Sequence, residues 1–128
     1  MEKKKVLVVD DEMYIGQLIG KALGNEYNVI LASNGEDALK ITHNEHPDLV
    51  LMDILMPKLD GYTACYQIKS DPATRTTPII MLTGIGYDLN RKLAEGMGAD
   101  GYIIKPFNPN ELLNTVRQYE TGLCPVCA

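Results

Sequence analysis

Short apolar runs alternate with polar turns along the chain, and four of these runs end on a polar residue. The runs are rich in Val, Ile and Leu, which is typical of strands buried on both faces of a parallel sheet. A fifth run, at residues 28–32, predicts one more strand. The four runs and the polar residues after them are residues 6–9 before Asp10 and Asp11, 49–52 before Asp53, 79–82 before Thr83, and 101–104 before Lys105.

Segments with helical spacing of apolar residues separate the predicted strands. Asn34 and Glu36 mark a helix start with acids in its first turn, and Pro47 stops that helix after about His46. The predicted helices cover about residues 14–23, 34–46, 62–70, 88–96 and 109–119, and the fourth is weak because it has few apolar anchors. This alternation predicts a doubly wound α/β fold, a five-stranded parallel sheet with five helices.

The polar residues at the strand ends predict a single site. In an open parallel sheet, ligands bind just beyond the carboxyl ends of the strands. Asp10, Asp11 and Asp53 would bring three carboxylates there, with the Thr83 hydroxyl and the Lys105 ammonium beside them. Three acids suit a hard divalent cation, and the hydroxyl and ammonium suit an anion next to it. Such a set of groups fits the transfer of a phosphoryl group.

Composition narrows the class of protein further. The chain has 128 residues and a net charge of -5, and its Lys and Arg residues are scattered apart from residues 3–5. This distribution argues against direct binding of DNA or RNA. The sequence contains no apolar stretch long enough to span a bilayer and no signal-peptide core, so we expect a cytoplasmic protein that does not bind membranes.

Four motifs, in order and each at a strand end, carry a resemblance to a known family. They are Asp10-Asp11, residues 53–57 (Asp-Ile-Leu-Met-Pro) with Asp60-Gly61, Thr83-Gly84, and residues 105–107 (Lys-Pro-Phe). Over about residues 4–120 the chain resembles the receiver domain of two-component response regulators. The resemblance implies a flavodoxin-like fold that takes a phosphoryl group from a histidine kinase or a histidine phosphotransfer protein onto one aspartate. The modified surface then binds a downstream effector protein or domain.

Chemistry gives the phosphoryl-binding residues their expected roles. Asp53 is the candidate nucleophile, because a carboxylate can attack phosphorus to form an acyl phosphate. Mg²⁺ suits the charge neutralisation that this attack needs, with Asp10, Asp11 and Asp53 as carboxylate ligands. Lys105 and Thr83 can bind phosphoryl oxygens.

The resemblance adds three expectations that the residue chemistry does not give. It implies that the backbone carbonyl of Leu55 is a further metal ligand. It also implies that Tyr102 changes its exposure with the position of Thr83, so that these two residues form a switch. A cis bond before Pro106 is usual in the family.

Several of these residues also have simpler interpretations. Asp10 and Asp11 can also cap the following helix, and His43 and His46 fit a helix C-terminus better than a ligand role. The main alternative function is a Mg²⁺-dependent phosphohydrolase with an aspartyl-phosphate intermediate. Such an enzyme would need a second acid where Leu55 stands, and a substrate-selecting cap. We therefore expect a signalling domain that catalyses only its own phosphorylation and dephosphorylation.

The last residues depart from the family pattern. We expect residues 1–120 to form the receiver domain and residues 121–128 a tail, or a linker to a further module. Cys124 and Cys127 in this tail form a C-x-x-C motif, which can supply half of a zinc site or a redox pair. With Cys65 they otherwise fit reduced thiols in the cytosol.

Overall fold

Five parallel strands form one sheet in the order β2-β1-β3-β4-β5. The structure is a computed structural model and describes residues 3–54, 56, 58–84, 96, 98–105 and 107–120. The strands are β1 (Lys4–Val9), β2 (Tyr27–Ala32), β3 (Leu49–Asp53), β4 (Ile79–Thr83) and β5 (Gly101–Ile104). The helices are α1 (Met13–Leu23), α2 (Gly35–Glu45), α3 (Gly61–Ser70) and α5 (Pro109–Glu120).

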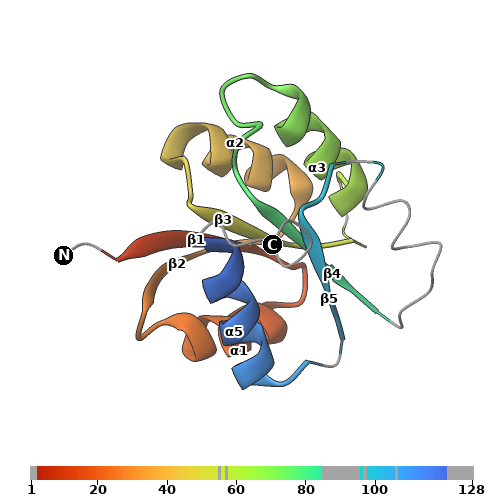
Figure 1. The fold of residues 1–128 in the computed structure, drawn as a ribbon. Helices are drawn as coiled ribbons and strands as arrows, with labels where there is room; N and C mark the ends of the chain where they lie inside the picture. The colour runs from red at the N-terminus through yellow and green to blue at the C-terminus, as the bar shows by residue number, and fades with distance from the viewer. Residues whose placement is uncertain are drawn as a thin grey trace.

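Helices cover both faces of the sheet, as the sequence predicted. Figure 1 shows α1 and α5 below the sheet and α2 and α3 above it. The doubly wound five-stranded sheet is therefore confirmed. The helix predicted at residues 88–96 falls almost entirely outside the described residues, so four of the five expected helices are described.

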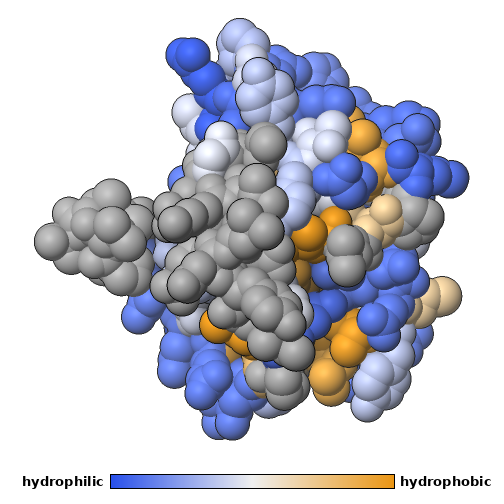
Figure 2. All heavy atoms as spheres, turned by 90° about the vertical axis from the view of Figure 1, so that its right-hand side faces the viewer, coloured by the Kyte–Doolittle hydropathy of each residue, from blue (hydrophilic) through white to orange (hydrophobic). Residues whose placement is uncertain are grey.

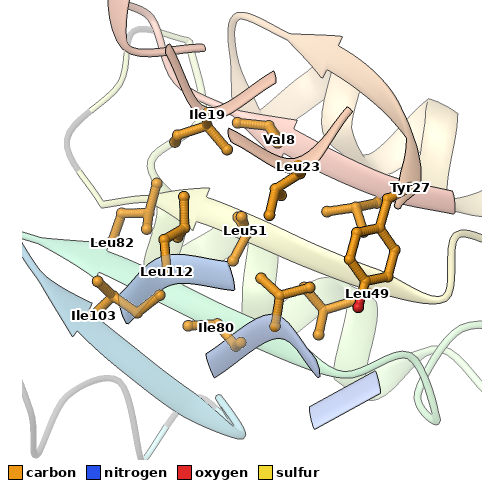
Figure 3. Close-up of a cluster of buried hydrophobic side chains, with 12 residues drawn as sticks. Val8, Ile19, Leu23, Tyr27, Leu49, Leu51, Ile80, Leu82, Ile103 and Leu112 are labelled. Atoms are coloured by element: carbon orange, nitrogen blue, oxygen red, sulfur yellow. The ribbon is translucent and has the colours of Figure 1, made fainter. Parts of the chain in front are cut away.

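The two layers of helices enclose two separate hydrophobic cores. Successive side chains of a strand point to opposite faces, so Val6 and Val8 of β1 pack toward α1 and α5, whereas Leu7 and Val9 belong to the other core. Figure 3 shows the first core, in which Leu112 of α5 lies over Leu51 of β3. The strand residues of β3 and β4 are all buried, which explains their uninterrupted apolar runs.

Short polar side chains begin three of the helices. The Asn34 side chain accepts a hydrogen bond from the Asp37 N–H (2.9 Å), and Asp60 accepts one from the Thr63 N–H (2.9 Å). Asn108 accepts from the Asn110 N–H at 2.7 Å. These caps satisfy N–H groups that have no partner inside the helix.

The start of α1 does not have the aspartate cap that was the alternative interpretation of Asp10 and Asp11. Glu12 occupies the capping position without a side-chain hydrogen bond. Asp10 instead accepts a hydrogen bond from the Glu12 N–H (2.9 Å), outside the helix. The side chain of Asp10 therefore fixes the turn after β1 and does not cap α1.

The far end of α2 matches the predicted stop. His43 lies in the last turn, and His46 follows the helix in the left-handed conformation, with φ 47°.

The Cys65 thiol of α3 is buried, and burial raises its pKa to about 11. Cys124 and Cys127 lie outside the described residues. Among the described residues, no helix has both the length and the apolar character needed to cross a membrane.

Lys58, in the loop between β3 and α3, offers a test of backbone strain. Its φ of 68° lies in the left-handed region, which costs an L-residue roughly 1–2 kcal/mol but costs glycine little. We expect Lys58→Gly to raise the free energy of unfolding by up to about 1 kcal/mol, since the extra freedom of glycine in the unfolded chain offsets part of the gain. Urea denaturation checks this, with Lys58→Ala as the control that removes the side chain and keeps the strain. A glycine variant less stable than the alanine variant would contradict the strain argument.

Candidate functional site

The carboxylates of Asp10, Asp11 and Asp53 meet at the carboxyl ends of β1 and β3. These strands are neighbours with Val9 opposite Met52, so the residues that follow are also side by side. One oxygen from each of the three aspartates lies within 4.8 Å of the others. Asp10 and Asp53 are buried, whereas Asp11 is exposed. The structure thus brings together the three acids that the sequence analysis singled out.

Lys105 reaches this cluster from the end of β5. Its Nζ lies 3.1 Å from Asp10 Oδ2 and 3.4 Å from Asp53 Oδ1. The Lys105 N–H donates to the Thr83 carbonyl (2.7 Å), which fixes the backbone at this point. Burial by itself would lower the pKa of the Lys105 ammonium, but the Asp53 and Asp10 carboxylates outweigh it and raise that pKa. Lys105 therefore stays charged while it is partly buried.

Asp53 carries an unfavourable negative charge. Burial raises the pKa of its carboxyl group to about 6, and the charge of Asp10 adds to the rise, although Lys105 and the Ile54 N–H oppose it. The Ile54 N–H donates to Asp53 Oδ1 at 2.9 Å. At neutral pH most of the carboxylate is ionised, yet ionisation costs more here than in water. A cation or a bond to an electrophile at this position would relieve that cost.

Thr83 supplies a buried hydroxyl without a partner. It ends β4, the strand paired with β3, and only 5% of its surface is exposed. Its Oγ1 makes no hydrogen bond, although a buried polar group normally has one. Among the described residues only Thr42 of α2 shares this property, and Thr42 belongs to no predicted site. An acceptor such as a phosphoryl oxygen would complete the hydrogen bonding of Thr83.

The remaining predicted residues fall into two groups. Tyr102 is half-buried on β5, opposite Met81, and packs against the core formed by α2 and α3. Leu55, Pro57 and Pro106 lie outside the described residues, so the structure says nothing of a Leu55 carbonyl ligand or of a cis bond before Pro106.

Two functional groups were missed by reasoning from the sequence. The backbone N–H groups of Glu12 and Ile54 hold the Asp10 and Asp53 carboxylates in place. Every residue except proline has such an N–H, so no residue type could have marked these two positions.

The strands run toward the face shown in Figure 2. The coloured part of this face is mostly hydrophilic, with separate hydrophobic patches between the polar regions. A mostly hydrophilic surface on the side toward which the strands run suits a site for charged groups.

The fold and this cluster of carboxylates with a lysine define the class of protein. Residues 6–117 match the response regulator receiver domain family. The chain belongs to this family, and its function is that of a receiver in two-component signalling. This result favours the signalling function over the phosphohydrolase alternative.

Proteins with similar sequences are longer regulators. The chain is 47% identical over 116 residues to a probable transcriptional regulator, ycf27, of Guillardia theta, covering 90% of this chain and 44% of that protein. It is 44% identical over 110 residues to the alkaline phosphatase synthesis transcriptional regulatory protein PhoP of Bacillus subtilis, covering 85% of this chain and 45% of PhoP. The chain thus spans less than half the length of these relatives.

Solved structures of similar proteins share the whole fold. A putative response regulator from Chloroflexus aurantiacus is 35% identical with a TM-score of 0.90, and the match covers 94% of this chain and 99% of that one. The receiver domain of the sensor histidine kinase PA1611 from Pseudomonas aeruginosa PAO1 is 29% identical with a TM-score of 0.86, covering 93% and 98%. That structure has a magnesium ion coordinated in its active site cleft.

Proposed function

We propose that Asp53 is the phosphoacceptor of this receiver domain. A phosphohistidine of a histidine kinase or histidine phosphotransfer protein is the expected donor. An Asp53 carboxylate oxygen attacks phosphorus, a P–O bond forms, and the P–N bond breaks with its electron pair returning to the imidazole. The observation that carries this proposal is the ammonium of Lys105 within 3.4 Å of a buried carboxylate whose charge is unfavourable.

The three carboxylates also fit a metal ion. Oxygen ligands and an exposed member such as Asp11 suit Mg²⁺, which keeps several waters and takes one or two carboxylates. When bound, Mg²⁺ supplies positive charge that offsets the repulsion between Asp53 and the phosphoryl oxygens. Asp10, Asp11 and Asp53 would hold it, with the Leu55 carbonyl as a further ligand by resemblance to the family.

Lys105 and Thr83 bind the negatively charged oxygens of the phosphoryl group. Lys105 already bridges Asp10 and Asp53, and it can exchange one carboxylate for a phosphoryl oxygen without leaving its place. Thr83 donates its unpaired hydroxyl to another oxygen. Movement of Thr83 toward the phosphoryl group would then open space for Tyr102. Tyr102 lies opposite Met81, which is on β4 like Thr83. This movement is the proposed switch.

The output of the switch is the binding of a downstream effector protein or domain. Two relatives are named transcriptional regulators and are more than twice the matched length, so an effector module joined through residues 121–128 fits the pattern. The receiver domain itself would occupy residues 1–120, work in the cytoplasm without contacting nucleic acid or membrane, and catalyse only its own phosphoryl transfer and dephosphorylation.

A small phosphodonor tests the proposal directly. Incubation with acetyl phosphate and Mg²⁺, followed by borohydride trapping and peptide mass spectrometry, should place one phosphate on Asp53. Phosphate on another residue would contradict the assignment. Many turnovers of a phosphate ester would instead support the hydrolase.

Mg²⁺ is expected to stabilise the folded protein. An ion that binds only the folded state adds about 1.4 kcal/mol at a concentration of ~10 Kd. Thermal melts should therefore rise with Mg²⁺, and Asp11→Ala should remove most of the rise. Glu36→Ala, which removes an exposed acid outside the cluster, should keep the full response. A wild-type melting curve indifferent to Mg²⁺ would argue against the site.

The two unpaired hydroxyls separate function from stability. Thr42→Val and Thr83→Val each remove a buried oxygen without a partner, so each should raise the free energy of unfolding by about 1 kcal/mol. Only Thr83→Val should slow the phosphorylation of the protein by acetyl phosphate. Chemical denaturation and phosphorylation rates of both variants check this. Equal phosphorylation of the two variants would remove Thr83 from the site.

A further inference from the structure

Lys69, near the end of α3, turns its ammonium inward at the edge of the domain opposite the phosphoacceptor. Its Nζ lies 2.7 Å from Asp100 Oδ2, 2.7 Å from the Thr77 carbonyl and 3.3 Å from the Arg75 carbonyl. An ammonium has three N–H donors, so each can have an acceptor here. Only 16% of the Lys69 side chain is exposed. A lysine held this way is not an ordinary solvated surface residue.

Asp100, the partner of Lys69, fixes the entry to β5. Its N–H donates to the Ile79 carbonyl, and its Oδ2 accepts from the Ile79 N–H, both at 2.8 Å. Gly98 just before it has a φ of 93°, and a Cβ there would lie 3.1 Å from Lys69 Cγ. The backbone of this segment therefore rests on the stem of Lys69, while the ammonium holds the Asp100 carboxylate.

The position of β5 decides where Lys105 lies. β5 has four residues and is one of the two edge strands of the sheet; among the described strands it pairs only with β4 (Figure 1). Gly101 lies opposite Ile80 and Ile104 opposite Thr83, and the Lys105 N–H then bonds the Thr83 carbonyl. A slip of one residue would turn every side chain of β5 to the other face and move Lys105 away from the carboxylates. So short a strand needs a further contact at its start that fixes its register on β4.

We propose that Lys69 is a positioning residue for phosphoryl transfer. Through Asp100 it fixes the register of β5 on β4, and thereby holds the Lys105 ammonium beside Asp53. Lys69 touches none of the reacting groups, because Asp100 precedes β5 and Lys105 follows it. The inference rests on the proposed function of Asp53.

Three variants separate positioning from mere stability. Lys69→Met keeps an unbranched stem against Gly98 and removes the ammonium, whereas Lys69→Arg keeps a cation. Ile68→Val is the matched control, because it trims a buried neighbour in α3 and leaves the pair intact. Initial rates of phosphorylation are measured over a range of acetyl phosphate concentrations at saturating Mg²⁺, at a temperature where every variant is folded. Amide hydrogen exchange of Asp100 and Lys105 is measured on the same samples.

Lys69→Met should lower the limiting rate about tenfold, which is ~1.4 kcal/mol of barrier. It should also speed amide exchange at both Asp100 and Lys105. Lys69→Arg should restore most of the rate, and Ile68→Val should leave rate and exchange at Lys105 unchanged. Asp100→Asn should repeat the loss, and the double variant Lys69→Met/Asp100→Asn should be no slower than either single variant, since the two residues act as one unit.

Two results would overturn the inference. A limiting rate for Lys69→Met equal to that of Ile68→Val would make Lys69 a purely stabilising residue. Unchanged exchange at Lys105 in Lys69→Met would show that the start of β5 does not control its end. If wild-type protein takes no phosphate on Asp53, the proposed function is wrong, and the exchange at Lys105 still decides whether Lys69 fixes β5.

Discussion

Asp53→Asn is expected to abolish phosphorylation and to make the metal-free protein more stable at pH 7. The carboxyl pKa is raised from 3.8 to about 6, chiefly by burial and then by the charge of Asp10. Ionisation is therefore costlier in the folded state, by as much as about 3 kcal/mol for a rise of this size. Asparagine keeps the shape and has no charge to bury, so the free energy of unfolding should rise by up to that amount.

The stability difference between the wild type and Asp53→Asn should depend on pH in a defined direction. Well below pH 4 the Asp53 carboxyl group is protonated in both the folded and the unfolded state, and it imposes no penalty. Between about pH 4 and pH 6 the Asp53 carboxyl group ionises first in the unfolded state, so the wild type should lose stability relative to Asp53→Asn as the pH rises. Urea denaturation with a chelator present, at several pH values, measures the difference. Parallel stability curves for the two proteins, or trapped phosphate at the wild-type level on the variant, would refute the assignment.

Gly61→Ala is expected to destabilise the domain by about 3 kcal/mol or more. Gly61 begins α3, and its N–H donates to the Ile54 carbonyl at 2.8 Å. A Cβ on Gly61 would collide with the backbone carbonyl of Asp53 and lie 2.9 Å from the Ile54 Cα. Backbone atoms cannot turn aside as a side chain can, so the helix or β3 must shift, and overpacking of this kind typically costs 1–3 kcal/mol or more.

Gly20→Ala is the matched control for this substitution. It adds the same methyl group to the interior of α1, where the nearest atom is Val29 Cγ1 at 3.9 Å. Alanine is the better helix former, so this variant should be up to about 1 kcal/mol more stable. Denaturant midpoints of the two variants test the pair. Gly61→Ala should also phosphorylate more slowly, because a shift of the Asp53 backbone moves the nucleophile. Wild-type stability in Gly61→Ala would contradict the close approach.

The sequence predicted the features that repeat along the chain. Buried parallel strands are continuous apolar runs, so the ends of β1, β3, β4 and β5 could be read directly, and with them the meeting of Asp10, Asp53 and Lys105. β2 begins at Tyr27, one residue earlier than expected, because the aromatic ring is also part of the core. Such boundaries depend on packing that a pattern does not contain.

Other features depend on the folded structure and leave no pattern in the sequence. The pairing of Lys69 with Asp100 joins residues that are far apart in sequence, and a lysine in α3 looks like any exposed lysine. The raised pKa of Asp53 follows from its burial beside Asp10, and the Thr83 hydroxyl is buried at the end of β4 without a hydrogen-bond partner. The residue types predicted which groups meet at the site. The strength of the interactions between these groups could be inferred only from the distances in the folded structure.

The contact between Lys105 and Asp10 also ties the chemistry to the completion of folding. The two residues are 95 positions apart in the chain. A nascent chain that has emerged only as far as β4 already holds all three aspartates but not the lysine. Contacts between residues so far apart in sequence form late in folding. Closing a long loop loses chain entropy before the contact contributes any favourable energy. If Asp53 is the phosphoacceptor, as proposed, Lys105 joins it only when β5 docks on β4, so that an incompletely folded copy would carry the aspartates without their lysine.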